Sequence, residues 1–120
     1  MFLQKVRLKN VGGLVFVYYY TCPHCLNSIV NLNQYEGNGV VDKVLALTSV
    51  ADTNSKKIFL EDFCPTFEIR EFPKEDIRKI TNQFPVSYYV KDGNIVQSFV
   101  GEVTCWAVFK SHLLDTLTQS

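Results

Sequence analysis

Apolar residues cluster along this chain in short continuous runs that predict buried strands. Residues 14–20 and 44–48 are almost wholly apolar or aromatic, which is typical of strands that are covered on both faces of a sheet. Residues 67–72 alternate apolar and charged positions, and Asp92-Gly93 separates two further apolar runs as a hairpin turn does. Strands are therefore predicted at residues 6–9, 14–20, 44–48, 67–72, 86–90 and 94–100.

Between these runs the apolar positions recur at helical spacing. The first helix is predicted from Pro23, which is tolerated in a first turn, to near Tyr35, where Glu36-Gly37 begins a stop signal. Three more helices are predicted, from the possible caps at residues 52–55 to about Phe63, over about 74–83 and over about 104–117. In the first helix Leu26, Ile29, Val30 and Leu32 keep helical spacing. The inward residues are predicted to be Ile77 and Ile80 in the third helix and Trp106, Phe109, Leu113 and Leu117 in the last.

Counted from the strand at residues 14–20, the elements follow the order β-α-β-α-β-α-β-β-α. This order predicts an α/β fold with a mixed central sheet, flanking helices, a closing β-hairpin and a C-terminal helix. A length of 120 residues favours one domain over residues 1–120, large enough to bury a core.

Composition and charge exclude several classes of protein. The chain is 47% hydrophobic and 20% charged, with 12 basic and 12 acidic residues, so it lacks the basic surplus of nucleic-acid binders. No stretch approaches the roughly 20 apolar residues of a membrane span, so no membrane contact is expected from this segment. Residues 1–8 lack an apolar signal-peptide core. Two localisations stay open: cytoplasmic if the chain is complete, and extracytoplasmic (periplasmic) if it is a domain excised from an exported or membrane-anchored parent.

The tetrad Cys22-Pro23-His24-Cys25 lies between a predicted strand and a predicted helix. Two thiols at this spacing can form a reversible disulfide, and this placement is typical of redox sites rather than zinc hairpins. The helix N-terminus favours a thiolate at Cys22, and Cys25 lies one turn further on, within reach to resolve a mixed disulfide. His24 can place a positive charge or a donor near the thiolate.

The other two cysteines, Cys64 and Cys105, are far from the tetrad in sequence. No second close Cys/His pair completes a structural zinc site. We expect both to be small buried hydrophobic residues, and a disulfide between them stays open.

Together with the tetrad, the downstream residues Phe84-Pro85, Asp92-Gly93 and Gly101 resemble the thioredoxin superfamily over about residues 12–117. In that family a cis proline faces the dithiol, and Pro85 matches it. Pro85, Gly93 and Gly101 are eight positions apart, as in the closing hairpin of the family. About residues 52–73 then form an inserted helix and strand relative to a minimal thioredoxin, which is similar to TlpA-like thiol-disulfide oxidoreductases. The tetrad itself is like that of periplasmic disulfide-bond oxidases.

The resemblance implies a thiol-disulfide oxidoreductase that acts on protein substrates and needs a recycling redox partner but no separate cofactor. It implies catalytic roles for Cys22, Cys25, His24, Pro23 and Pro85, with Phe84 and Gly101 contacting substrate. The backbone of Phe84 is expected to pair with an extended substrate segment. The direction of electron flow stays open, because His24 favours an oxidising potential whereas the insertion is similar to that of reductases.

Three positions depart from the family pattern. Thr21 replaces a frequent Trp, Phe16 occupies the position of the buried acid of thioredoxins, and Ser28 replaces a Glu of TlpA-like reductases. The sequence therefore offers no general acid or base for Cys25 beyond His24 or water.

Two other functions remain open. Cys22, His24 and Cys25 could bind or deliver copper or zinc, since thiolate and imidazole suit both metals. The chain could instead be a redox-inert interaction domain, because a fold does not fix a function.

Overall fold

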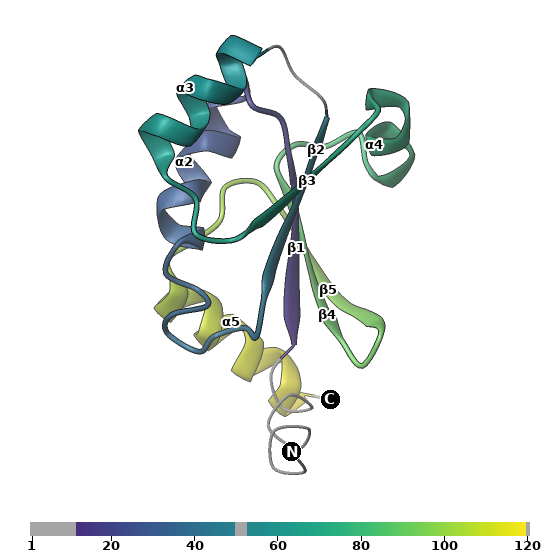
Figure 1. The fold of residues 1–120 in the computed structure, drawn as a ribbon. Coiled ribbons are helices and arrows are strands. Elements are labelled where there is room, and N and C mark those ends of the chain that lie inside the picture. Colours follow the sequence, from purple (N-terminus) through teal and green to yellow (C-terminus); the bar gives the residue numbers. More distant parts are fainter. Residues whose placement is uncertain (1–11, 50–52, 120) are drawn as a thin grey trace, which may run out of the picture.

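The fold is built on one five-stranded mixed sheet (Figure 1). A computed structural model of the chain describes residues 12–49 and 53–119, and the side chains up to residue 112. Among these residues the strand order is β3-β2-β1-β4-β5, with β1, β2 and β3 parallel and β4 antiparallel to both β1 and β5. The strands are β1 (Gly13–Tyr18), β2 (Val44–Ser49), β3 (Glu68–Phe72), β4 (Val86–Lys91) and β5 (Asn94–Val100).

Helices cover both faces of this sheet (Figure 1). They are α2 (Pro23–Leu32), α3 (Thr53–Phe63), α4 (Lys74–Ile80) and α5 (Trp106–Gln119). Helices α2, α3 and α5 lie on one side, and α4 lies on the other. The predicted order of elements and the predicted α/β class are confirmed, and the predicted strand at residues 6–9 lies outside the described residues. Within the described ranges, no helix has the length and apolar character that a membrane crossing requires.

The larger core cluster lies between the sheet and helices α2, α3 and α5. Ile29 of α2, Phe59 of α3 and Phe109 of α5 belong to this cluster, and Phe16 and Tyr18 of β1 pack with them. A smaller cluster of Val17, Ile77 and Val86 lies under α4. The alternating side chains of β1 thus serve both faces, as expected for a strand buried on both sides.

The turn between β4 and β5 is formed by Asp92 and Gly93, with φ angles of 54° and 80°. Positive φ at both central positions is the type I′ pattern, which matches the twist of a two-residue hairpin and explains the Asp-Gly pair. The predicted hairpin is confirmed. It returns β5 along β4 and places the segment after β5 next to the start of α2.

The predicted burial of Ile80 is wrong. Ile80 is 45% exposed, and Val30, which keeps the helical spacing of α2, is 64% exposed, because each points away from the face that its helix packs on the sheet. Ile80 is also the last residue of α4, which is shorter than predicted. In α5, Phe109 is buried and Trp106 is half-buried, whereas the side chains of Leu113 and Leu117 lie outside the described residues.

Candidate functional site

Cys22 is the N-cap residue of α2, and its sulfur is bound by the helix itself. The backbone N–H of Cys25 donates to Cys22 Sγ at 3.2 Å, and Pro23 occupies the first helical turn, where no N–H is needed. A sulfur in this position receives both a backbone donor and the positive end of the helix dipole, which favour negative charge. Cys22 is partly exposed, so other molecules can reach it.

Cys25 has the opposite environment. Its side chain is fully buried in the larger core cluster, among apolar and aromatic residues. Burial raises the pKa of the Cys25 thiol, and the contact with Cys22 raises it further. The two thiols of the tetrad are therefore unequal, one accessible to solvent and one shielded in the protonated form.

The loop before β4 supplies the third part of the site. The Phe84–Pro85 peptide bond is cis, and the Phe84 ring packs on Tyr19 with ring centroids 4.2 Å apart. The N–H of Gly101 donates to the carbonyl oxygen of Pro85 at 2.9 Å. Since Gly101 has a φ of 105°, a region that favours glycine, the segment after β5 reaches this carbonyl without strain.

His24 is paired with a residue that the sequence did not single out. Its Nδ1 lies 2.7 Å from Oε1 of Glu102, and Nδ2 of Asn27 donates to the same oxygen at 3.1 Å. These contacts lower the pKa of the Glu102 carboxyl, the one with His24 first and the one with Asn27 second. The imidazole in the tetrad is therefore neighboured by a carboxylate, rather than acting as an isolated positive charge.

Further bonds attach the segment of residues 101–104 to α2. Ser28 is fully buried, and its hydroxyl donates to the carbonyl of His24 at 3.1 Å and accepts the N–H of Val103 at 2.9 Å. Nδ2 of Asn31 donates to the carbonyl of Val103 at 2.8 Å. Side chains of α2 thus hold the segment that carries Gly101 and Glu102 beside the tetrad.

Solved structures of similar architecture match nearly the whole chain. StoA from Bacillus subtilis superposes with a TM-score of 0.70 at 17% identity, covering 86% of this chain and 82% of that chain. A secreted disulfide oxidoreductase from Mycobacterium tuberculosis, homologous to E. coli DsbE, gives a TM-score of 0.69 at 14% identity, covering 92% and 85%. A thiol:disulfide interchange protein of the thioredoxin family from Chlorobium tepidum gives 0.69 at 18% identity, covering 94% and 84%.

The fold is thioredoxin-like. No family model matches the sequence, and no curated protein matches it. At these identities the similarity is one of fold. Within this thioredoxin-like fold, the structure places the predicted site residues at one end of the sheet, around the N-terminus of α2 and the turn before β4.

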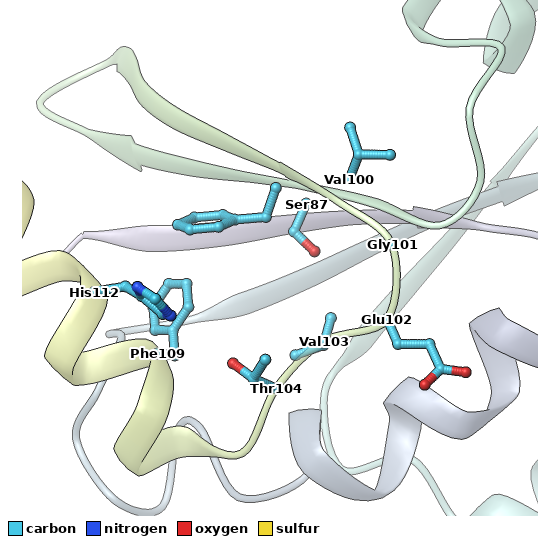
Figure 2. A pocket seen from close by; sticks show the side chains of 9 residues that line it. Ser87, Val100, Gly101, Glu102, Val103, Thr104, Phe109 and His112 are labelled. Carbon is cyan, nitrogen blue, oxygen red and sulfur yellow. The ribbon is translucent and has the colours of Figure 1, made fainter.

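A pocket of about 260 Å³ lies on the other side of the segment of residues 101–104, between β5 and α5 (Figure 2). Phe99 and Phe109 form apolar walls, and the buried Ser87 adds a hydroxyl that has no hydrogen-bond partner in the part of the chain that the structure describes. Figure 2 shows the Glu102 side chain directed away from this pocket. The tetrad and Pro85 do not line it, so the two features share a wall and are separate sites.

Cys64 and Cys105 are not the buried residues that the sequence predicted. Both are exposed free thiols. Cys64 follows the last residue of α3 with a φ of 44°, and Cys105 precedes α5, so each lies at a helix end rather than on a helix face that packs on the sheet. Of the four cysteines, Cys22 and Cys25 are therefore the pair that the fold brings together and surrounds with specific contacts.

The metal-binding alternative finds no support in the geometry. Within residues 12–49 and 53–119, no three His, Cys, Asp or Glu side chains converge as metal ligands do. Nδ1 of His24 lies against the Glu102 carboxylate, so this ring nitrogen already has a partner in the structure.

Glu102 is the residue near the tetrad that sequence reasoning missed. It is 78 positions from His24, and no local pattern marks it. The one available signal is its place directly after Gly101, to which the resemblance assigns a contact with substrate.

Proposed function

We propose that this chain is a thiol-disulfide oxidoreductase that exchanges disulfides with protein substrates. The observation that carries the proposal is the inequality of the two thiols. Cys22 is accessible and bound by a backbone N–H at the start of α2, whereas Cys25 is buried one turn further along. A nucleophile needs access and a stabilised thiolate, and a resolving thiol needs proximity and protection from other reagents.

The reaction follows from this arrangement. The Cys22 thiolate attacks a substrate disulfide and forms a mixed disulfide, while one substrate sulfur leaves. Cys25 then attacks Cys22 and releases the second substrate sulfur, so the dithiol is oxidised and the substrate is reduced. A recycling partner restores the starting state, and the reverse sequence of steps oxidises a substrate dithiol.

The loop at Phe84-Pro85 is the proposed docking point for the substrate. An extended segment can pair with the backbone of Phe84 as an added strand, and Gly101 borders the same loop through its bond to Pro85. The space beside Gly101 is open, since a Cβ built there would meet no atom within 4 Å. A substrate segment can therefore approach the backbone at this edge.

The comparisons support the same class of function. Two of the superposed structures are described as a disulfide oxidoreductase and a thiol:disulfide interchange protein, and their fold is similar to that of this chain over most of its length. The fold alone would also suit a redox-inert interaction domain. The accessible Cys22 sulfur beside the buried Cys25 favours the enzyme.

The test is the reduction of insulin by dithiothreitol, with the protein as catalyst. The parent is expected to accelerate precipitation of the insulin B chain, and Cys22→Ser is expected to abolish the acceleration. A double variant, Cys64→Ser with Cys105→Ser, is the matched control, because it removes the two exposed thiols outside the site and should keep full activity. Full turnover by Cys22→Ser would rule the mechanism out.

A further inference from the structure

The pocket between β5 and α5 has a buried serine hydroxyl in its wall. Ser87 is 2% exposed, and its hydroxyl has no hydrogen-bond partner among the described residues. Figure 2 shows this hydroxyl directed to the side of the sheet on which Val103 and Phe109 lie. A buried hydroxyl without a partner costs free energy, and such groups are normally satisfied by the protein, by water or by a ligand. The Ser87 hydroxyl is therefore available to a polar group that comes from outside the chain.

The sheet register explains why a cavity forms at this position. Ser87 of β4 pairs with Phe16 of β1 on one side and with Phe99 of β5 on the other. Because paired residues point to the same face of a sheet, a small side chain lies in a row between two phenylalanine rings. Phe109 of α5 packs on this row, with its ring centroid 5.2 Å from that of Phe99. Space of about 260 Å³ therefore remains beside the smallest member of the row.

The wall of the pocket that follows β5 is fixed by hydrogen bonds. The N–H of Val103 donates to the Ser28 hydroxyl at 2.9 Å, and the carbonyl of Val103 accepts from Asn31 at 2.8 Å. The carbonyl of the next residue, Thr104, accepts from the Tyr35 hydroxyl at 2.6 Å. A wall held at three points does not collapse into the cavity. The pocket is therefore preformed, which is typical of small-molecule sites.

The lining residues determine which ligand chemistry fits. Phe99, Phe109 and Val103 provide apolar and aromatic surface, and the Ser87 hydroxyl can both donate and accept a hydrogen bond. The Glu102 carboxylate is directed away from the pocket (Figure 2). Burial of a charged group against apolar walls is costly without a partner of opposite charge. The pocket therefore favours a neutral ligand that combines an apolar ring with one hydroxyl.

The size and the opening of the pocket set the size of the ligand. An apolar cavity of about 150 Å³ binds benzene, so a pocket of about 260 Å³ has room for a substituted ring. Thr104 and His112 line the pocket and are exposed, so a ligand can enter from solvent on their side.

We propose that this pocket binds a phenolic ring, which packs against Phe99 and Phe109 and forms a hydrogen bond with the Ser87 hydroxyl. The proposal goes beyond the proposed function, because neither the tetrad nor Pro85 lines the pocket. A phenolic ring can come from a free small molecule or from a tyrosine side chain of another protein. The two sources share this chemistry, and the experiment distinguishes them.

The test compares phenol with toluene, which has a methyl group in place of the hydroxyl. Each is titrated into the ¹⁵N-labelled protein, and amide chemical shifts are followed by NMR. Both should give saturable shifts at the amides of residues 99–104 and of Phe109, with half-saturation by phenol below about 5 mM. Ser87→Ala should weaken phenol binding about 5-fold, as expected for one net hydrogen bond, and leave toluene binding within about 2-fold.

Two properties of the serines make the comparison sharp. Ser87→Ala removes a hydroxyl that has no partner among the described residues, so thermal unfolding should show no loss of stability. Ser98→Ala is the matched control, because Ser98 pairs with Tyr88 and points to the opposite face of the sheet from Phe99. It should leave the binding of phenol and toluene unchanged.

N-acetyltyrosine amide distinguishes the two sources of the ring. Tighter binding than phenol at the same amides assigns the pocket to a tyrosine side chain, and weaker binding assigns it to a free small molecule.

The proposal fails on either of two results. One is the absence of saturable shifts at these amides with phenol. The other is a Ser87→Ala variant that binds phenol as tightly as the parent does, or that weakens phenol and toluene equally. Cys22→Ser should bind phenol as the parent does, so this site and the proposed function stand or fall separately.

Discussion

Nδ1 of His24 and Oε1 of Glu102 lie 2.7 Å apart at the mouth of the candidate dithiol site. The two residues are far apart in sequence, and they meet because Gly101 binds the carbonyl of Pro85 and Val103 binds Ser28. His24 is thus held by the same segment that borders the cis-proline loop. Any effect of the imidazole on the thiols includes the charge of this carboxylate.

The pairing predicts a change in the titration of Glu102. Its pKa lies below the ordinary value of 4.5, with the contact to His24 as the largest cause. In His24→Ala the pKa should therefore rise toward that value, and in Asn27→Ala it should rise less. Carbon-detected NMR titration of the carboxyl group measures both, and an unchanged Glu102 in His24→Ala would contradict the pairing.

The direction of the pKa change of Glu102 also determines how the contribution of this contact to stability depends on pH. A lowered carboxyl pKa means that the contact favours the folded state above the ordinary pKa of Glu102 and stops doing so as the pH falls through the folded-state value. Both side chains are largely exposed, so the effect on the free energy of unfolding is small.

Ser28→Ala should destabilise the fold measurably. The Ser28 hydroxyl is fully buried and accepts the N–H of Val103, so the variant leaves a buried donor without a partner. We expect a loss of about 1–3 kcal/mol in the free energy of unfolding, measured by urea denaturation. Ser98→Ala, at an exposed position of β5, is the control and should change it by less than about 0.5 kcal/mol. Equal effects of the two variants would show that the bond to Val103 contributes nothing.

Gly101→Ala should also cost stability, for a backbone reason. Gly101 has a φ of 105°, a backbone conformation that residues other than glycine rarely adopt, although an added Cβ would meet no neighbouring atom. The expected loss is about 1–3 kcal/mol in the free energy of unfolding. Gly37→Ala is the matched control, because its Cβ also meets open space and its φ is not in this region. A neutral Gly101→Ala would mean that the segment can rearrange freely around Pro85.

The sequence predicts the strands and the hairpin well because their signals are local. Short continuous runs of apolar, β-branched and aromatic residues are typical of strands buried on both faces, and residues 14–20 and 44–48 correspond to β1 and β2 within two residues at each end. Asp92-Gly93 specifies a turn geometry that few other pairs allow. The tetrad at a strand-to-helix junction is equally local, and the structure places it there.

The errors come from information that is not local. Val30 and Ile80 are apolar and keep helical spacing, yet which face of a helix is covered depends on its tertiary neighbours. Cys64 and Cys105 lie next to predicted helix ends, and whether a helix end is covered also depends on tertiary neighbours. The partner of His24 is supplied by chain that returns only after β5, so no window of sequence contains both residues.

Cys25→Ser should trap the reaction at its midpoint. Without the resolving sulfur, Cys22 remains bonded to one sulfur of the disulfide that it attacks. Mixed disulfides with disulfide-containing test proteins should therefore accumulate and be visible on a non-reducing gel. Cys22→Ser in the same assay should give no mixed disulfide through residue 22. A Cys25→Ser variant that turns over insulin as fast as the parent would exclude the resolving role.

The most direct measurement of the central claim is site-resolved alkylation. The reduced parent protein is treated briefly with iodoacetamide at neutral pH, and peptide mass spectrometry follows each cysteine. Cys64 and Cys105 are exposed thiols outside the site and serve as internal references, and Cys25 is buried. The account predicts that Cys22 reacts first, faster than both references and than free cysteine, with Cys25 protected. A Cys22 that reacts no faster than Cys64 and Cys105, or not at all, would contradict it.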